Sequence, residues 1–178
     1  MEIIDLEFPG VKLIVPTYLY DERGYSTEAY SEKALLNCGI DTKFVVDYEC
    51  SNTLRGTVRG IHFQENPHAQ IKLVRVLKGE LASFVVDLRA DSPTYKKWTS
   101  VSLSDRNRRQ LYLPSGYGYA YMTMRPDTVV LYKFSDFYEK SLSRAVRWND
   151  PEIGIKWPED VTAISDRDKN APLLRALP

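Results

Sequence analysis

The feature that most constrains the fold is a succession of short runs rich in β-branched and aromatic residues, separated by scattered prolines and glycines. No internal repeat, low-complexity tract or Ser/Gly-rich linker divides the chain. Apolar and polar residues alternate in Lys72–Leu77, which leaves one face of a strand for the core and the other for solvent or a cavity. The spacing of the runs predicts a β-sandwich or barrel. Strands are expected over Leu13–Val15, Phe44–Tyr48, Gly60–Gln64, Ile71–Leu77, Ala82–Leu88, Lys97–Leu103, Arg109–Leu113, Ala120–Met124 and Thr128–Phe134.

Helical signal is weak by comparison. One helix is predicted within Ser26–Leu36, and Gly39 can end it after Cys38. Short turns near Ser104–Asn107 and a C-terminal helical segment complete the expected structure.

Length, charge and cysteine content narrow the class of protein. With 178 residues the chain suits one domain, residues 1–178. Lys plus Arg (24) equals Asp plus Glu (24), so no global field attracts nucleic acid or an anionic membrane, and local arginines must hold any anionic ligand. Cys38 and Cys50 are too few for a disulfide scaffold, and neither a secretory leader nor a membrane-spanning run is visible. We therefore expect a soluble cytoplasmic protein that binds neither nucleic acid nor membrane.

The run Arg59–Gln64, which reads Arg-Gly-Ile-His-Phe-Gln, places one of only two histidines beside an arginine. A neutral imidazole can take a proton from carbon while an arginine holds an anionic substrate. The alternative is a purely structural histidine that forms hydrogen bonds within a core.

Several further segments accompany this run in a fixed order. They are Asp21–Tyr25, Lys72–Val76, Val86–Arg89, Ser92–Thr94, Lys97-Trp98, Pro114–Tyr117, Leu131–Lys133 and Trp148–Pro151. Together the set resembles the RmlC-like dTDP-4-dehydrorhamnose 3,5-epimerases over nearly the whole chain. The resemblance implies an all-β, cupin-type jelly-roll barrel with a few short helices and a homodimer that exchanges N-terminal strands. It also implies a nucleotide-diphosphate 4-keto-6-deoxy sugar as substrate, and neither a metal nor an organic cofactor.

The residues themselves also argue against a metal. Metal-binding cupins need several histidines and a carboxylate around one ion. This chain offers only His62 and His68, and Tyr119 stands where the cupin pattern after Pro-x-Gly would place another histidine.

The implied reaction needs a base, because a proton on carbon next to a ketone is weakly acidic, and a cation to stabilise the charge that forms on the carbonyl oxygen. His62 matches the family base. Its imidazole needs a carboxylate to fix its tautomer, and Asp168 matches that partner by position, with Asp166 as a competing candidate.

The resemblance assigns two further catalytic roles. Lys72 is expected near the C4 keto oxygen, although on its own it reads as an ordinary solvated strand lysine. Tyr132 matches the residue that returns a proton from the opposite face, and its alternative reading is an amphipathic wall residue.

Substrate-binding residues follow from the same resemblance. Arg59 and Arg23 match residues that grip the diphosphate, Arg23 reaching in from the other subunit; surface salt bridges are the alternative. Glu28, Ser51 and Tyr138 match positions that line the pocket, although Glu28 equally suits a helix surface.

Differences from the family pattern point to an altered pocket. Val46 and Tyr48 replace amides, and Tyr119 replaces a histidine, so contacts with the nucleotide or sugar differ. We expect Tyr119 and Tyr48 to be substrate-binding residues. A dual 3,5-epimerase is predicted. An epimerase that inverts C3 or C5 alone, a silent sugar-nucleotide-binding cupin and a purely structural jelly roll are the alternatives.

Overall fold

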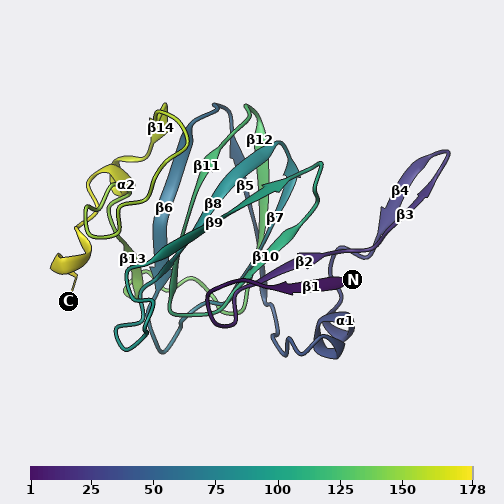
Figure 1. Ribbon diagram of the computed structural model, residues 1–178, viewed down its shortest axis with the longest axis horizontal. Coiled ribbons are helices and arrows are strands. Elements are labelled where there is room, and N and C mark those ends of the chain that lie inside the picture. Colours follow the sequence, from purple (N-terminus) through teal and green to yellow (C-terminus); the bar gives the residue numbers. More distant parts are fainter. Residues whose placement is uncertain (178) are drawn as a thin grey trace.

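The computed structural model describes residues 1–177 and consists mainly of two six-stranded sheets packed face to face (Figure 1). The first sheet has the order β1 (Glu2–Asp5), β2 (Lys12–Val15), β10 (Gln110–Leu113), β7 (Lys72–Lys78), β12 (Thr128–Phe134) and β5 (Val46–Asn52). The second has the order β13 (Ser143–Ala145), β6 (Thr57–Gln64), β11 (Tyr117–Thr123), β8 (Glu80–Asp87) and β9 (Trp98–Ser104), and β14 (Ala163–Ile164) pairs parallel to β6. The predicted all-β jelly roll is confirmed.

The core lies between the sheets because alternate residues of each strand point inward. Val74 and Val76 of β7 and Val130 of β12 meet Tyr119 and Tyr121 of β11 there. The outer face of the second sheet packs against the C-terminal segment, and that of the first sheet packs against the N-terminal segment and α1 (Glu32–Asn37).

A hairpin of β3 (Tyr18–Asp21) and β4 (Gly24–Thr27) projects from the barrel (Figure 1). Sequence patterns did not predict it. Arg108, from the turn between β9 and β10, lies over the rings of Tyr18 and Tyr25 of this hairpin. The hairpin is therefore tied to the barrel by cation–π contacts.

The predicted helix over Ser26–Leu36 starts too early. Ser26 and Thr27 pair with β3, and α1 begins at Glu32, where Ser31 Oγ accepts the N–H of Ala34 at 3.3 Å. Ser26 and Ser31 are both residue types that can cap a helix N-terminus. The pattern alone placed the start at the first of them, whereas the structure uses the second. The end is as predicted, because Gly39 has a positive φ of 78° directly after Cys38.

Most predicted strands are confirmed with shifted ends. The start of the predicted strand Phe44–Tyr48 is wrong: pairing of β5 with β12 begins at Val46. Phe44 instead packs edge-on against Tyr30 beneath the first sheet. The remaining helices are α2 (Asp166–Lys169) and a 3-10 turn (Leu174–Ala176), which agree with the predicted C-terminal helical segment. Within residues 1–177, no helix is both long and apolar enough to cross a membrane.

Candidate active site

An irregularity in β6 brings the two candidate site residues of the Arg59–Gln64 run onto one face. Residues three apart on a regular strand point to opposite faces. Here His62 pairs with Tyr119 and Arg59 pairs with Tyr121, and the register shifts between these two pairs. Since Tyr119 and Tyr121 both point into the barrel, His62 and Arg59 do so as well.

Gly60 makes this irregularity possible. Its φ is +120°, and a Cβ at this position would lie 2.5 Å from the Cβ of Ala120. No side chain fits such a close approach of two backbones.

His62 forms the central contact of the site. Its Nε2 lies 2.6 Å from Oδ1 of Asp168, and the Gly60 N–H donates to Oδ2 of the same carboxylate at 3.1 Å. The His62 side chain is 37% exposed and that of Asp168 is 3% exposed. Burial alone would raise the pKa of Asp168, but the hydrogen bonds from His62 and Gly60 bring this pKa below its ordinary value.

The C-terminal segment positions this carboxylate. β14 runs beside the start of β6, and α2 begins directly after Ser165, whose Oγ accepts the Asp168 N–H at 3.2 Å. Asp168 is buried against β6, whereas Asp166 is exposed. The structure thus pairs Asp168, and not Asp166, with His62.

Lys72 is a buried inward residue of β7, not a solvated strand lysine. Its Nζ donates to the backbone oxygen of His62 at 3.1 Å, which joins the two sheets across the barrel. Burial lowers the pKa of Lys72 to about 8. The hydrogen bond to the His62 backbone oxygen places the Lys72 ammonium beside this histidine.

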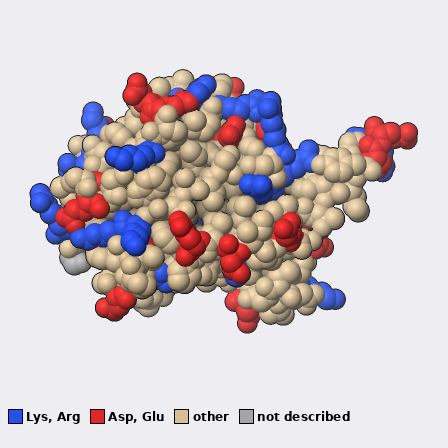
Figure 2. Space-filling view, viewed as in Figure 1, with Lys and Arg blue, Asp and Glu red and all other residues tan. Residues whose placement is uncertain are grey.

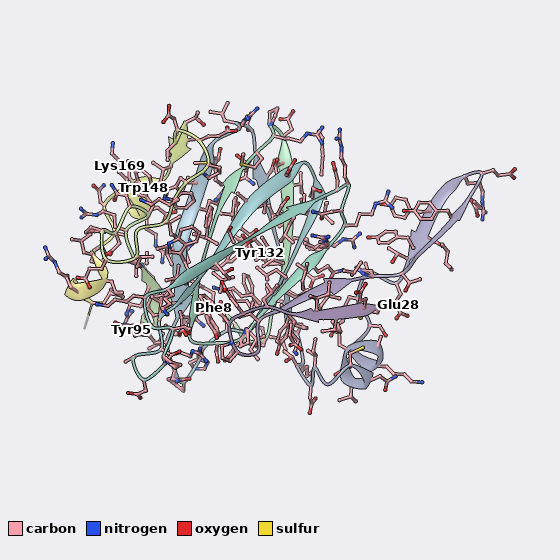
Figure 3. The ribbon with its side chains drawn as sticks, in the orientation of Figure 1. Phe8, Glu28, Tyr95, Tyr132, Trp148 and Lys169 are labelled. Atoms are coloured by element: carbon pink, nitrogen blue, oxygen red, sulfur yellow. The ribbon has the colours of Figure 1, made fainter. Side chains whose placement is uncertain are left out.

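Tyrosines form one wall of the same interior. Tyr132 is buried in β12 (Figure 3), and its ring centroid lies 6.0 Å from that of Tyr119 and 6.4 Å from that of Tyr48. Tyr119 is the cross-strand partner of His62, and its hydroxyl lies 2.9 Å from Ser83 Oγ. Burial raises the pKa of Tyr119 and of Tyr132, so both remain neutral phenols.

Arg59 and Ser51 meet at the edge of this interior. Arg59 Nε donates to Oδ1 of Asn52 at 2.9 Å, and Nη2 donates to the Ser51 backbone oxygen at 3.4 Å. Both residues are exposed enough to meet a ligand.

The remaining predicted residues lie at the periphery of this chain. Arg23 is at the tip of the hairpin, paired with Asp21 at 2.5 Å. Glu28 is exposed at the base of the hairpin, away from Tyr132 (Figure 3). Tyr138 is an exposed residue of the loop after β12. Within one chain these three do not join the cluster around His62.

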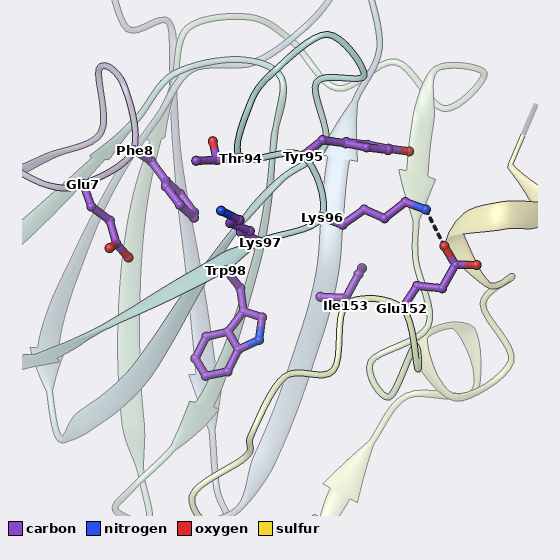
Figure 4. Close-up of a pocket in the computed structure, with 9 residues that line it drawn as sticks. All are labelled: Glu7, Phe8, Thr94, Tyr95, Lys96, Lys97, Trp98, Glu152 and Ile153. Carbon is purple, nitrogen blue, oxygen red and sulfur yellow. Dashed lines mark hydrogen bonds and ion pairs between the residues drawn. The ribbon is translucent and has the colours of Figure 1, made fainter.

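A pocket of about 630 Å³ lies elsewhere, lined by residues that include Phe8, Tyr95, Lys97 and Trp98 (Figure 4). None of the predicted site residues lines it. Its charged pair, Lys96 and Glu152, is neutralised by mutual contact. We place the candidate active site at His62 because a histidine–carboxylate pair and a buried lysine meet there.

No three or more His, Cys, Asp or Glu side chains gather into a metal-binding group anywhere in residues 1–177. His68 contacts Asp136 at 3.1 Å, near the loop that carries Tyr138.

Sequence reasoning missed two buried amides. Asn52 joins Arg59 to Tyr121, and Gln64 bonds the Phe137 backbone oxygen and the Glu139 N–H of the loop that carries Tyr138. Gln64 lies in the Arg59–Gln64 run. Nothing in a single sequence indicates that its amide, or that of Asn52, is buried and joins two elements by hydrogen bonds.

The fold and these side chains define a cupin-type jelly-roll barrel with a histidine–carboxylate pair, a buried lysine and a buried tyrosine inside. The model of the family described as dTDP-4-dehydrorhamnose 3,5-epimerase matches residues 5–176. The chain belongs to the dTDP-4-dehydrorhamnose 3,5-epimerase family, and it is an enzyme of the isomerase class.

Known proteins similar to this chain agree with this membership. A dTDP-4-dehydrorhamnose 3,5-epimerase of Sinorhizobium fredii is 43% identical over 174 residues, which cover 97% of this chain and 89% of that protein. The Bacillus anthracis dTDP-4-dehydrorhamnose 3,5-epimerase, solved with TDP and pyrophosphate bound, has a TM-score of 0.94 and 41% identity, covering 97% of this chain and 98% of the other.

A third similar protein carries a narrower activity in its name. ChmJ of Streptomyces bikiniensis, a 3'-monoepimerase, was solved with dTDP as a double mutant in which a histidine became asparagine and a tyrosine became phenylalanine. It has a TM-score of 0.90 and 31% identity, covering 96% of this chain and 86% of the other.

Proposed function

We propose that the enzyme epimerises a dTDP-linked 4-keto-6-deoxy sugar at C3 and C5, with dTDP-4-dehydro-6-deoxyglucose as the type of substrate. The observation that carries the proposal is the 2.6 Å contact between His62 and Asp168, with Lys72 beside it and Tyr132 in the same interior. The bound nucleotide and the names of the similar proteins support the dTDP-sugar class. The reaction moves protons only, so it needs no redox cofactor.

His62 acts as the base through Nδ1. A carboxylate only accepts hydrogen bonds, so Nε2, which faces Asp168, carries the imidazole proton and Nδ1 keeps its lone pair. The C–H proton next to the ketone passes to Nδ1, and the electron pair moves onto the C4 oxygen. Asp168 stabilises the imidazolium that forms.

Lys72 stabilises the enolate. Its ammonium uses one N–H on the His62 backbone oxygen and keeps others for the C4 oxygen. With a pKa of about 8 it is cationic at neutral pH. A cation in a dry interior stabilises a developing oxyanion far better than one in water.

Tyr132 returns a proton to the opposite face of the carbon. Its raised pKa keeps the O–H intact until the enolate accepts the proton. Solvent then reprotonates the phenolate and removes the proton from His62. The two residues substituted in ChmJ, a histidine and a tyrosine, lie as far apart in its chain as His62 and Tyr132 lie here, which supports this pairing.

Inversion of one carbon only is the second candidate function. The similarity to a 3'-monoepimerase favours it. Tyr119 also favours it, because its hydroxyl is engaged with Ser83 in the wall next to His62, and a small change in the wall shifts which carbon the base reaches.

Incubation with dTDP-4-keto-6-deoxyglucose in deuterium oxide, followed by proton NMR and mass spectrometry, tests both candidates. Exchange reports carbanion formation even where the equilibrium hides the product. Deuterium at C3 and C5 is expected for the dual epimerase, and at one carbon for the second candidate.

His62→Ala is the control for this experiment. It should abolish exchange while the protein stays folded and still binds dTDP. Exchange that continues in this variant would remove His62 from the mechanism, and binding without exchange in the unaltered enzyme would make it a silent sugar-nucleotide-binding protein.

We further propose that two chains form a homodimer in which the hairpin of each completes the other's site. Leu19 and Tyr20 are 68% and 69% exposed on the hairpin, and neighbouring exposed apolar side chains of this kind favour an interaction surface. This mostly uncharged arm ends in a charged tip that carries Arg23 (Figure 2). Packed on a second chain, it would deliver Arg23 to the diphosphate held by Arg59.

A further inference from the structure

Asn52, the last residue of β5, connects both sheets beside the proposed diphosphate site. It is 3% exposed. Its Oδ1 accepts hydrogen bonds from Arg59 Nε at 2.9 Å and from the Tyr121 hydroxyl at 3.0 Å, and its Nδ2 donates to the Thr128 backbone oxygen at 3.0 Å. One side-chain amide therefore forms hydrogen bonds with all three partners.

The orientation of this amide is fixed by its partners. A guanidinium has no acceptor, so the atom that faces Arg59 must be the oxygen, and a backbone carbonyl cannot donate, so the atom that faces Thr128 must be the nitrogen. Burial raises the pKa of Tyr121, which keeps its hydroxyl protonated as a second donor. Asn52 thus cannot rotate without losing hydrogen bonds in a dry interior.

The contact also fixes Arg59. With Nε held by Asn52 and Nη2 reaching the Ser51 backbone oxygen, the plane of the guanidinium is set and its remaining N–H groups are left for a ligand. An arginine side chain otherwise loses much rotational freedom when it grips a phosphate. Holding the group beforehand removes that cost.

We propose that Asn52 is a positioning residue for substrate binding, which holds the Arg59 guanidinium in the orientation that receives the diphosphate. The inference rests on the proposed function, because it assumes that Arg59 binds the diphosphate. The hydrogen bonds of Asn52 go to Arg59, Tyr121 and Thr128, and its loss weakens nucleotide binding through Arg59.

A double-mutant cycle with Asn52→Ala and Arg59→Ala tests the proposal, with dTDP and thymidine titrated by calorimetry. Asn52→Ala should weaken dTDP binding roughly tenfold, as expected for one lost hydrogen bond to a charged group. Thymidine binding should not change, because thymidine lacks the diphosphate that Arg59 would hold. In the Arg59→Ala background, Asn52→Ala should have no further effect on dTDP binding.

Thr42→Ala is the matched control. It removes another buried hydrogen bond, between Thr42 Oγ1 and the Tyr112 hydroxyl at 2.9 Å, away from Arg59. It should lower stability without changing dTDP affinity. If Asn52→Ala does not fold, Asn52→Ser takes its place with the same expected split.

The outcomes separate the two proposals. If Arg59→Ala weakens dTDP binding and the Asn52 variant does not, or if the Asn52 effect is the same in both backgrounds, the positioning role is overturned and the proposed function stands. If Arg59→Ala binds dTDP as tightly as the unaltered enzyme, the diphosphate role of Arg59 fails and the positioning role fails with it.

Discussion

Lys72 has an energetic cost that its proposed chemical role would explain. An ammonium buried in the barrel is less stable than one in water, and this shows in its pKa of about 8 against 10.5 for a free lysine. Each unit of that difference corresponds to about 1.4 kcal/mol. A charged group that destabilises the fold at neutral pH is typical of a functional site.

Replacement by an apolar side chain should therefore stabilise the protein. Lys72→Met is expected to raise the free energy of unfolding by roughly 1–3 kcal/mol at pH 7, after the lost hydrogen bond to the His62 oxygen is counted. Above a pH of about 8 the native lysine has lost its proton while the unfolded one keeps it up to about 10.5. The unfolded state then binds more protons, the unaltered protein gains stability with rising pH, and the advantage of the variant shrinks.

Denaturant unfolding of both proteins from pH 7 to pH 10 measures this difference. Lys78→Met, at the exposed end of the same strand, is the control and should change stability by less than about 0.5 kcal/mol. A Lys72→Met protein that is less stable than the unaltered one at pH 7 would show that the buried charge costs little. Turnover should be lost in this variant.

Single residues also show where sequence reasoning reached its limit. The Arg59–Gln64 run indicated His62 directly. Its pairing with Asp168 could be predicted only from the family resemblance, because 106 residues separate the two. Asp166 and Asp168 lie in the same short segment, and only burial against β6 distinguishes them. Burial of this kind depends on tertiary packing, which a single sequence does not encode in any local pattern.

At the scale of elements, β6 matters more than any other strand. Its irregularity turns Arg59 and His62 to one face, and the Gly60 N–H binds the same carboxylate that orients His62. A β-bulge of this kind re-aims side chains next to a site. The strand was predicted, and the irregularity within it was not, because glycine in a strand signals only that a bulge is possible.

Gly60→Ala should disrupt both the fold of this strand and the site. The added Cβ would lie 2.5 Å from Ala120 Cβ and 2.6 Å from the Tyr119 oxygen, at a φ of +120°. We expect a loss of roughly 3 kcal/mol or more in the free energy of unfolding, together with loss of turnover.

Gly24→Ala provides the matched control for stability. Gly24 has a similar φ of +127°, but nothing lies within 4 Å of the Cβ that would be added. It therefore carries the backbone strain without the close approach. Equal destabilisation of the two variants, measured by thermal or denaturant unfolding, would contradict the steric explanation.

The N-terminal elements were the hardest to predict. Ser26 and Thr27 suit a helix start by composition, yet they pair with β3 in an exposed hairpin. Tyr18, Tyr20 and Tyr25 are typical strand residues, but their segments are short and carry no core of their own. Tyr18 and Tyr25 contact the barrel through Arg108, which lies far away in the sequence.

At the scale of the whole molecule, the distribution of charge does not indicate where a second chain would bind, whereas the shape does. Acidic and basic side chains are interspersed over the visible face (Figure 2), and their totals are equal. The projecting hairpin is the asymmetric feature. A C2 dimer would let one patch serve both chains, with each arm resting on the other barrel.

Subunit mixing tests the exchanged arm. Arg23→Ala and His62→Ala chains should each form dimers with little activity. In a mixed dimer, one site combines an intact His62 with the intact Arg23 of the other chain, so about half of the unaltered activity should return. A monomeric mass in solution, or mixed dimers as inactive as the parents, would contradict exchange.

The distance along the chain between His62 and Asp168 has a consequence for how the enzyme is made. A ribosome delivers β5 through β12 first, and these strands can begin to pair while the segment with Asp168 has yet to be translated. A nascent barrel can therefore enclose its interior before His62 has its carboxylate partner. If His62 is the proposed base, competence for proton transfer is then among the last properties that a newly synthesised chain acquires.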